Sequence, residues 1–299
     1  CDGIERINIE LSLRNKLALC QRLTELLNGS LPLRTPEDDL DREALLGERR
    51  ARALELIESV QVRWAWLQGH LDLPLEQADA ALADLGITAG PLTSRVTHPT
   101  LFHRVQDHSV RVSWKAELRQ PLQEVFEGDH FRPILDKIDA LHREVLRSRV
   151  FVALHMHAGD GNVHTNLPVN SDDYQMLQEA NAAVDRIMTL ARDLGGVISG
   201  EHGIGITKYE FLTPEEVAPF HAYKAHVDPE GRFNQGKLMP GSGLVRAYTP
   251  SFSLMGFESL IMQQSDIGAI ADSVKDCLRC GKCKPVCSTP VSYTHLTLP

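Results

Sequence analysis

Two β-prone runs joined by a glycine-rich turn decide the fold that the sequence predicts. They read VFVALHMH at residues 150–157 and VHTNLPV at residues 163–169, with AGDGN between them. An Asp-Gly pair between two such runs is typical of a two-residue hairpin turn, because both turn positions favour a positive φ. The sequence therefore predicts an antiparallel hairpin with Asp160 and Gly161 at its turn.

Counting outward from that turn gives the register of the predicted hairpin. His157 then faces His164, and His155 faces Asn166. Directly opposed residues have Cβ atoms about 4.5–5.5 Å apart, and side chains two apart on a strand share a face. His157 and His164 could therefore share one metal ion, although polar residues on an exposed hairpin face would give the same pattern.

A second stretch combines an acid and a base with three glycines. Val197–Ser199 is expected to form a short buried strand, and it leads into GEHGIG at residues 200–205. Such glycines are typical of a backbone that turns sharply or closely approaches a ligand. Glu201 would complete a His-His-Glu set with the hairpin, the ligand pattern of a catalytic divalent metal, and His202 is a potential base. The alternative is a glycine-rich turn with exposed polar side chains.

Helical periodicity dominates the segments on both sides of the hairpin. Apolar residues three or four apart predict helices over residues 42–68, 75–85, 131–147 and 172–194. Ser171 is the expected N-cap of the last of these helices. Alternating apolar residues predict a strand over residues 6–13. The expected fold class is α+β, an antiparallel sheet with covering helices and a helical N-terminal insertion.

Three motifs resemble, in the same order, the C-terminal domain of the FAD-linked oxidases of the vanillyl-alcohol oxidase superfamily. They read HAGDGNVHTN at residues 157–166, SGEHGIG at residues 199–205, and DP…NQGK at residues 228–237. Lys208 follows the second motif, and Gln235 stands where the family commonly has proline. The family includes D-lactate, glycolate and D-2-hydroxyglutarate dehydrogenases.

The resemblance implies a metal centre and a base. His157, His164 and Glu201 would hold a divalent metal, zinc or manganese, which binds the carboxylate and hydroxyl of the substrate. His202 would accept the hydroxyl proton, and hydride would pass to FAD.

The resemblance also implies a substrate and flavin region. Asn166 would line it, and Asn234 and Lys237 would lie near the flavin. The candidate residues for binding the substrate carboxylate are Arg111, Lys115 and Arg119. The FAD-binding domain that normally precedes this domain is not evident in the chain, which begins with Cys and is expected to be a fragment of a longer protein.

Four cysteines near the end of the chain predict an iron–sulfur cluster. Cys277, Cys280, Cys283 and Cys287 have the Cys-x2-Cys-x2-Cys-x3-Cys spacing of bacterial 4Fe-4S ferredoxins. Zinc is the main alternative, although structural zinc sites usually use two separated pairs. The run is either a one-cluster module or part of a two-cluster module, in which the fourth cysteine ligates the other cluster.

These features divide the chain into five expected parts. Residues 1–95 form a helical insertion or the start of the cap domain, and residues 96–245 form the FAD-linked oxidase C-terminal domain. Residues 246–270 are a linker, and residues 271–290 are a small 4Fe-4S module, expected to be truncated. Residues 291–299 are expected to be a non-native tail.

Composition narrows the classes of function. Lys and Arg number 31 and Asp and Glu number 40, which gives a net charge of −9 and disfavours binding to nucleic acid. No apolar run reaches the roughly 20 residues of a membrane helix. No GxGxxG dinucleotide motif is present, so NAD is not the expected acceptor. The expected location is cytoplasmic, or peripheral at the inner face of the membrane.

The sequence as a whole favours the C-terminal part of an FAD- and metal-dependent 2-hydroxy-acid dehydrogenase. Electrons would leave the flavin through the 4Fe-4S cluster to a quinone or a carrier protein. One alternative is a non-catalytic iron–sulfur electron-transfer subunit. Another is a metallohydrolase in which the His-His-Glu site activates water.

Overall fold

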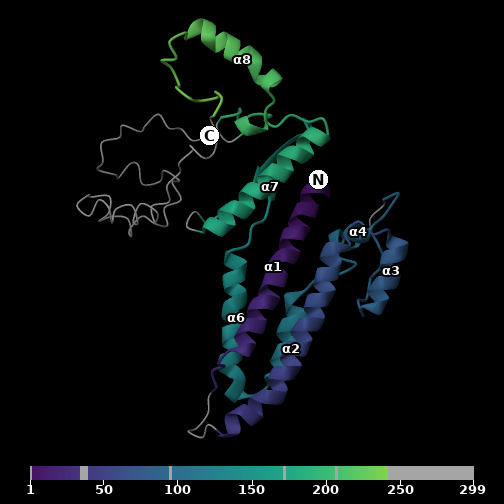
Figure 1. Ribbon diagram of the computed structural model, residues 1–299. Coiled ribbons are helices and arrows are strands. Elements are labelled where there is room, and N and C mark those ends of the chain that lie inside the picture. The colour runs from purple at the N-terminus through teal and green to yellow at the C-terminus, as the bar shows by residue number, and fades with distance from the viewer. Residues whose placement is uncertain (1, 34–39, 94–95, 171–172, 206–207, 242–299) are drawn as a thin grey trace, which may run out of the picture. The chain divides into compact units, whose positions relative to one another are not determined.

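The computed structural model describes residues 2–33, 40–93, 96–170, 173–205 and 208–241 (Figure 1). The helices and strands in these ranges are α1 (Asp2–Asn28), α2 (Leu40–Gly69), α3 (Leu75–Asp84), α4 (Leu101–Gln106), the π-helix η1 (Lys115–Arg119), α5 (Gln120–Val125), the 3-10 helix η2 (Asp129–Phe131), α6 (Arg132–Arg147), β1 (Ala153–His157), β2 (Asn162–Asn166), α7 (Tyr174–Asp193), the 3-10 helix η3 (Tyr209–Phe211) and α8 (Pro214–Val227). The predicted linker, cysteine cluster and tail lie outside the described residues.

The described residues form two compact units. The first unit contains the chain up to Asn170 together with Gln178–Ala180, and the second contains the other described residues. Among the described residues, the structure is helical apart from one antiparallel sheet of two strands. This combination of helices with a small antiparallel sheet agrees with the expected α+β class. No helix in the described ranges has the length and apolar character needed to cross a membrane.

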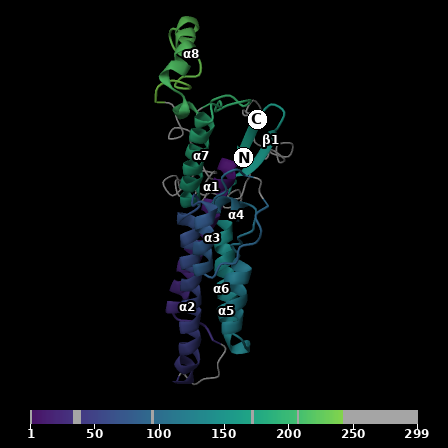
Figure 2. The ribbon, with the colours of Figure 1, turned by 90° about the vertical axis from the view of Figure 1, so that its right-hand side faces the viewer.

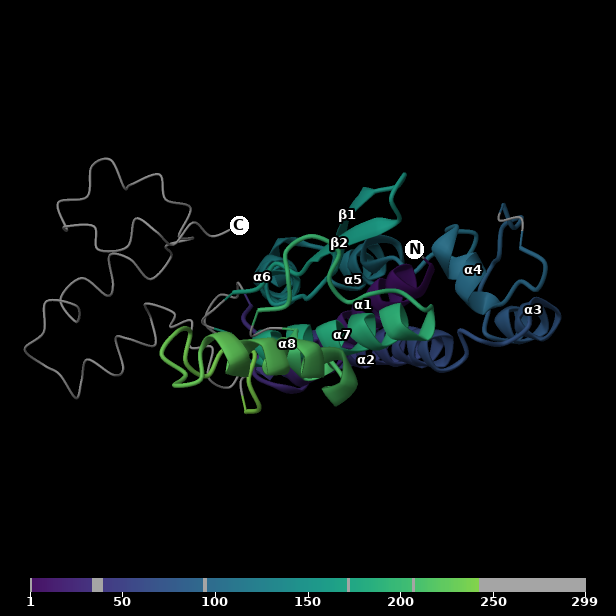
Figure 3. The same ribbon diagram turned by 90° about the horizontal axis from the view of Figure 1, so that it is seen from above.

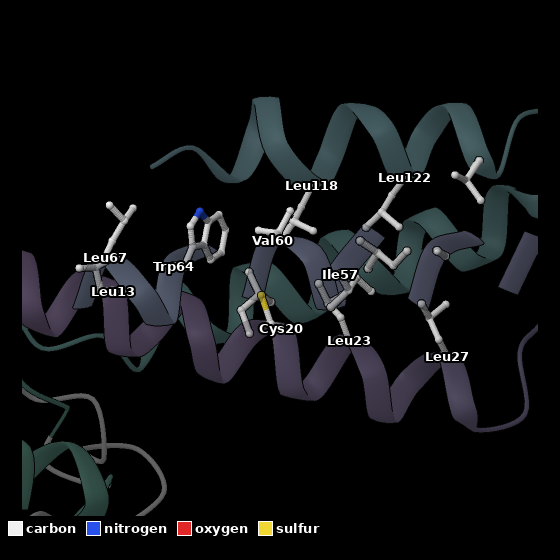
Figure 4. Close-up of a cluster of buried hydrophobic side chains, with 14 of the residues drawn as sticks. Leu13, Cys20, Leu23, Leu27, Ile57, Val60, Trp64, Leu67, Leu118 and Leu122 are labelled. Carbon is white, nitrogen blue, oxygen red and sulfur yellow. The ribbon is translucent and has the colours of Figure 1, made fainter. Parts of the chain in front are cut away.

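A helical core holds the first unit together. Helix α1 packs against α2 and α6, and α2 also packs against α5 and η1 (Figure 1). Figure 4 shows apolar side chains of α1, α2 and the η1–α5 segment meeting in one cluster. Trp64 is fully buried there, and its indole nitrogen donates to the carboxylate of Glu117 at 3.1 Å, so the polar atom of this large side chain is satisfied.

The predicted strand over residues 6–13 is wrong, because this segment is the first part of helix α1. Ile7 and Leu11 fit both a period of two and a helical period. Ile4, three residues before Ile7, fits only the helical one, and all three side chains are buried. The helical face then continues through Leu23 and Leu27 against α2.

The other helices of the first unit largely follow the predictions. Helices α2, α3 and α6 confirm the three expected ones, and α3 ends just before Gly86, whose φ is 69°. Helix α4 was not expected, because six residues are too few to show a periodic pattern. Within it, Arg104 is buried and forms a bidentate pair with Asp79 at 2.7 Å.

The predicted hairpin is present (Figures 2 and 3), but its register is shifted by two residues. His155 pairs with His164, His157 with Asn162, and Ala153 with Asn166, so the expected pairing of His157 with His164 is wrong. The turn contains four residues, and the Asp160 N–H donates to the His157 carbonyl at 3.0 Å. Longer turns of this kind are common in hairpins. A shift by two preserves the face on which each side chain lies.

The base of the hairpin is tied to helix α1. The Asn8 amide nitrogen donates to the Val152 carbonyl at 2.9 Å, and the Asn8 amide oxygen accepts from the Val152 N–H at 2.7 Å. The Asn8 side chain thereby replaces the two hydrogen bonds that a neighbouring strand would make to the backbone of Val152. The two-stranded sheet therefore takes its position from the helical core.

Helices α7 and α8 are the main elements of the second unit. Asp173 is the N-cap of α7 and accepts from the Met176 N–H at 2.9 Å, whereas the expected cap, Ser171, lies outside the described residues. The expected strand at Val197–Ser199 is wrong, because Val197 is 80% exposed and the segment has no strand geometry. Two adjacent apolar residues are too few to distinguish a strand from a loop.

Candidate metal and flavin sites

Three histidines gather on one face of the hairpin. The ring centroids of His157 and His164 are 5.4 Å apart, and the ring of His155 lies 5.6 Å from each of the other two. His157 is exposed and His164 is half-buried. Two imidazoles bound to one tetrahedral zinc at about 2.0–2.1 Å place their centroids roughly 5 Å apart. The hairpin pair therefore fits a shared divalent ion.

His155 belongs to this cluster, although no role was predicted for it. The sequence signal was its position two residues before His157, which places both side chains on the same face. Asn166 lies on that face as well, two residues beyond His164, and its side chain is exposed. The hairpin thus presents imidazole ligands together with an amide that can donate and accept hydrogen bonds.

Glu201 and His202 lie in a loop of the second unit that is closed by its own hydrogen bonds. The Ser199 hydroxyl donates to the Gly203 carbonyl at 2.6 Å, and the Lys208 ammonium donates to the Ser199 oxygen at 3.3 Å. Gly203 has a φ of 72°, a conformation that side-chain-bearing residues rarely adopt. Glu201 Oε2 lies 4.0 Å from His202 Nε2, so the loop presents a carboxylate beside an imidazole.

Asn234 and Lys237 line a cavity of about 730 Å³ in the second unit. Apolar and aromatic side chains form much of its wall, including Phe220, Tyr223 and Phe233. A mostly apolar wall with a few polar groups is typical of a site for a small molecule. Sequence reasoning missed the aromatic residues, since nothing in their spacing marks a common cavity.

Asp228 organises the turn beside this cavity. Its carboxylate accepts from the Lys224 ammonium at 2.7 Å and from the N–H groups of Arg232 and Phe233 at 2.8 and 3.0 Å. The Lys224 contact, followed by the backbone donors, lowers the pKa of Asp228. Asn234 follows with a φ of 46°, and its backbone carbonyl accepts from the Lys237 N–H at 3.1 Å. The DP…NQGK motif is therefore one tightly hydrogen-bonded turn.

The candidates for binding a substrate carboxylate have different surroundings. Arg119 forms a bidentate pair with Asp139 at 2.6 and 2.9 Å, which engages its guanidinium in the structure of the first unit. Arg111 is exposed and lines a separate cavity of about 690 Å³. Lys115 is exposed at the start of η1.

Comparison with known proteins finds a family match over part of the chain. Residues 127–238 match the model of the family described as FAD linked oxidases, C-terminal domain. This span includes the hairpin, the Glu201 loop and the turn around Asp228. No solved structure gives a significant match to the chain.

Several curated relatives are similar to the chain. The glycolate oxidase subunit GlcD of Escherichia coli is 39% identical over 93 residues, 30% of this chain and 19% of that protein. The D-lactate dehydrogenase of Archaeoglobus fulgidus is 41% identical over 86 residues, 28% of this chain and 19% of that protein. The D-2-hydroxyglutarate dehydrogenase of Stutzerimonas stutzeri is 26% identical over 205 residues, 67% of this chain and 39% of that protein. The chain therefore matches about a fifth to two fifths of the length of these relatives.

Proposed function

We propose that the chain is the C-terminal part of an FAD-dependent dehydrogenase that oxidises 2-hydroxy acids with the help of a divalent metal. The observation that carries the proposal is the imidazole pair on the hairpin, at a separation suited to one ion, inside the span that matches the FAD linked oxidases. The relatives named for glycolate, D-lactate and D-2-hydroxyglutarate share one feature in their substrates, a hydroxyl beside a carboxylate.

The donor chemistry fits a divalent metal. His157 and His164 each offer an imidazole nitrogen, and Glu201 offers a carboxylate oxygen. Two nitrogens and one oxygen suit zinc or manganese, and three protein ligands leave room for a substrate oxygen.

The proposed roles of the other residues follow from their chemistry. When bound, the divalent ion would supply polarisation of the substrate hydroxyl and FAD would supply the hydride acceptor. His202 would accept the hydroxyl proton, because an imidazole changes charge near neutral pH. Asn166 would orient the substrate by hydrogen bonding. Asn234 and Lys237 would contact the flavin beside the aromatic wall of their cavity.

The proposal extends to electron transfer and to the division of the chain. Residues 96–245 would form the substrate domain behind the insertion at residues 1–95, and residues 246–270 would link it to a 4Fe-4S segment at residues 271–290, before the tail at residues 291–299. That segment would pass electrons to a quinone or a carrier protein. The spacing of its four cysteines supports this step.

A metal-binding measurement on this chain tests the first part of the proposal. Wild-type protein loaded with zinc and desalted is expected to retain one ion per chain at the hairpin site. His157→Ala should lose this ion, while His98→Ala, which removes an exposed histidine elsewhere in the first unit, should keep it. The cysteines can bind zinc too, so both variants are compared in a background with Cys277 and Cys280 replaced by serine. Retention of the ion by His157→Ala would contradict the proposed ligand set.

A spectroscopic titration tests the reaction. The protein together with its flavin-binding part is reduced anaerobically by glycolate, D-lactate or D-2-hydroxyglutarate, and the visible flavin bands are recorded. Bleaching by one of these acids supports the dehydrogenase and identifies its substrate. An iron–sulfur absorbance without flavin bands or any response to the acids would instead favour an electron-transfer subunit.

A further inference from the structure

A cavity of about 330 Å³ lies between α1 and the end of α6, in the first unit. Its lining includes Asn8 and Lys16 from α1, Trp114, and His142, Arg149 and Phe151 from α6 and the segment after it. None of the hairpin histidines contributes to the lining. The volume corresponds to about ten water molecules at roughly 30 Å³ each, enough for a small organic molecule.

The charges around this cavity are one-sided. Lys16 and Arg149 line it, and no Asp or Glu does so. The Lys16 ammonium donates to the Ser12 hydroxyl at 2.8 Å, and this hydroxyl is a neutral partner. Burial lowers the pKa of Lys16, Glu117 opposes this shift from outside the lining, and Arg149 adds a smaller lowering effect. Two cations that disfavour each other in a half-buried space favour an anion between them.

Apolar surfaces complete the cavity. The indole of Trp114 stacks on the imidazole of His142, with centroids 4.4 Å apart and planes 14° apart. Phe151, which is 39% exposed, lies beneath the Arg149 guanidinium at 5.3 Å. A ligand with a charged head and a flat or aliphatic body can use both kinds of surface.

The larger cavity of the first unit provides a contrast. Its lining contains Arg63 and Arg111, but also Asp107 and Glu117, so its cations and acids balance. The excess of cations is a property of the Lys16–Arg149 cavity and not of the cavities of this unit in general.

We propose that the cavity between α1 and α6 binds a small organic carboxylate. The carboxylate group of the ligand would lie between Lys16 and Arg149, and the apolar body of the ligand would pack on Trp114 and Phe151. Asn8 lines the same cavity and makes both hydrogen bonds to Val152, just before β1. A ligand there would therefore act on the segment that anchors the hairpin.

Calorimetric titration of the 299-residue chain with benzoate, and with its neutral isostere benzamide, tests this proposal. Benzoate should bind at least tenfold more tightly than benzamide, because the cations contribute only to the anion. Lys16→Gln and Arg149→Gln should each weaken benzoate binding by about tenfold or more, the effect of one charge-assisted hydrogen bond. Arg147→Gln, which removes an exposed cation of α6 outside the lining, is the matched control and should leave the affinity unchanged.

The outcomes separate a binding site from a merely hydrated cavity. Equal affinity for benzoate and benzamide, equal losses in Arg147→Gln and Arg149→Gln, or no benzoate heat up to about 10 mM would each overturn the proposal. Lys16 is half-buried, so its replacement can disturb α1. Arg149 is exposed, and its variant keeps the test decisive when circular dichroism shows that Lys16→Gln is misfolded.

Discussion

At the scale of single residues, His142 couples the stability of the first unit to pH. Burial lowers the pKa of His142 below that of an ordinary imidazole, Asp139 opposes this shift, and Lys16 adds to it. The folded chain therefore binds this proton less readily than the unfolded chain does. The free energy of unfolding should decrease as the pH falls below about 6.5, and level off only below the folded pKa.

The measurement is the unfolding temperature at pH 7.5 and at pH 5.5. We expect the wild type to lose stability between them, and His142→Gln to lose less. The exposed His98 serves as control, and His98→Gln should keep the wild-type difference. A pH response that is the same in His142→Gln and in the wild type would show that other groups carry it.

The residue types of the candidate site and the strand face on which they lie could be predicted from the sequence, but the distances between them could not. His157 and His164 remain on one face although the predicted turn is two residues too short, because an even register shift does not exchange the faces. The cavity around Lys16 and Arg149 has no such signal, because 132 residues separate the two cations in the sequence. Only the packing of α1 beside α6 brings them together.

At the scale of elements, the hairpin turn depends on one glycine. Gly161 has a φ of 67°, whereas Gly159 in the same turn has no positive φ, and neither would meet another atom if it carried a Cβ. Gly161→Ala should therefore cost about 1 kcal/mol through backbone strain alone. Gly159→Ala should cost much less.

The zinc affinity of the hairpin tests this prediction, because the turn determines the relative positions of the histidines on β1 and β2. We expect weaker binding for Gly161→Ala and a near-wild-type value for Gly159→Ala. The reverse order would mean that the turn adopts a different conformation in solution.

The packing of α2 gives a second prediction at this scale. Ile57 is fully buried in the cluster of Figure 4, while Val62 on the same helix is 55% exposed. Ile57→Ala should lower the free energy of unfolding by about 2–5 kcal/mol, the cost of a large-to-small change in a core. Val62→Ala should stay within about 0.5 kcal/mol of the wild type. Urea titration monitored by circular dichroism compares the two variants, and equal effects would contradict the assignment of this face to the core.

A helix with a sustained apolar period was predictable and a six-residue helix was not, for a physical reason. Helix α2 repeats its apolar spacing over many turns, so the burial of Ile57, Val60 and Trp64 follows from the sequence. Helix α4 spans less than two turns, and its burial of Phe102 depends on tertiary neighbours. The strand expected at residues 6–13 shows the opposite error, in which a few alternating residues outweighed the longer helical pattern.

At the scale of the whole molecule, the proposed metal takes its ligands from two segments that are well separated in the sequence. His157 and His164 lie on the hairpin, and Glu201 lies in the loop at residues 199–205. An ion that binds only the folded state stabilises it by about 2.7 kcal/mol at 100 times its dissociation constant. If one ion takes ligands from both segments, that stabilisation must reach both segments.

Hydrogen exchange measured by mass spectrometry, with and without zinc, tests this link. In the wild type, zinc should slow exchange in the hairpin at residues 153–166 and also in the loop at residues 199–205. Glu201→Gln should abolish the protection of both segments, because loss of the carboxylate weakens the ion that the histidines hold. Glu210→Gln removes an exposed acid of the second unit outside the proposed ligand set and should keep both effects. Hairpin protection that persists in Glu201→Gln would mean that the histidines bind zinc without this carboxylate, which would contradict the proposed ligand set.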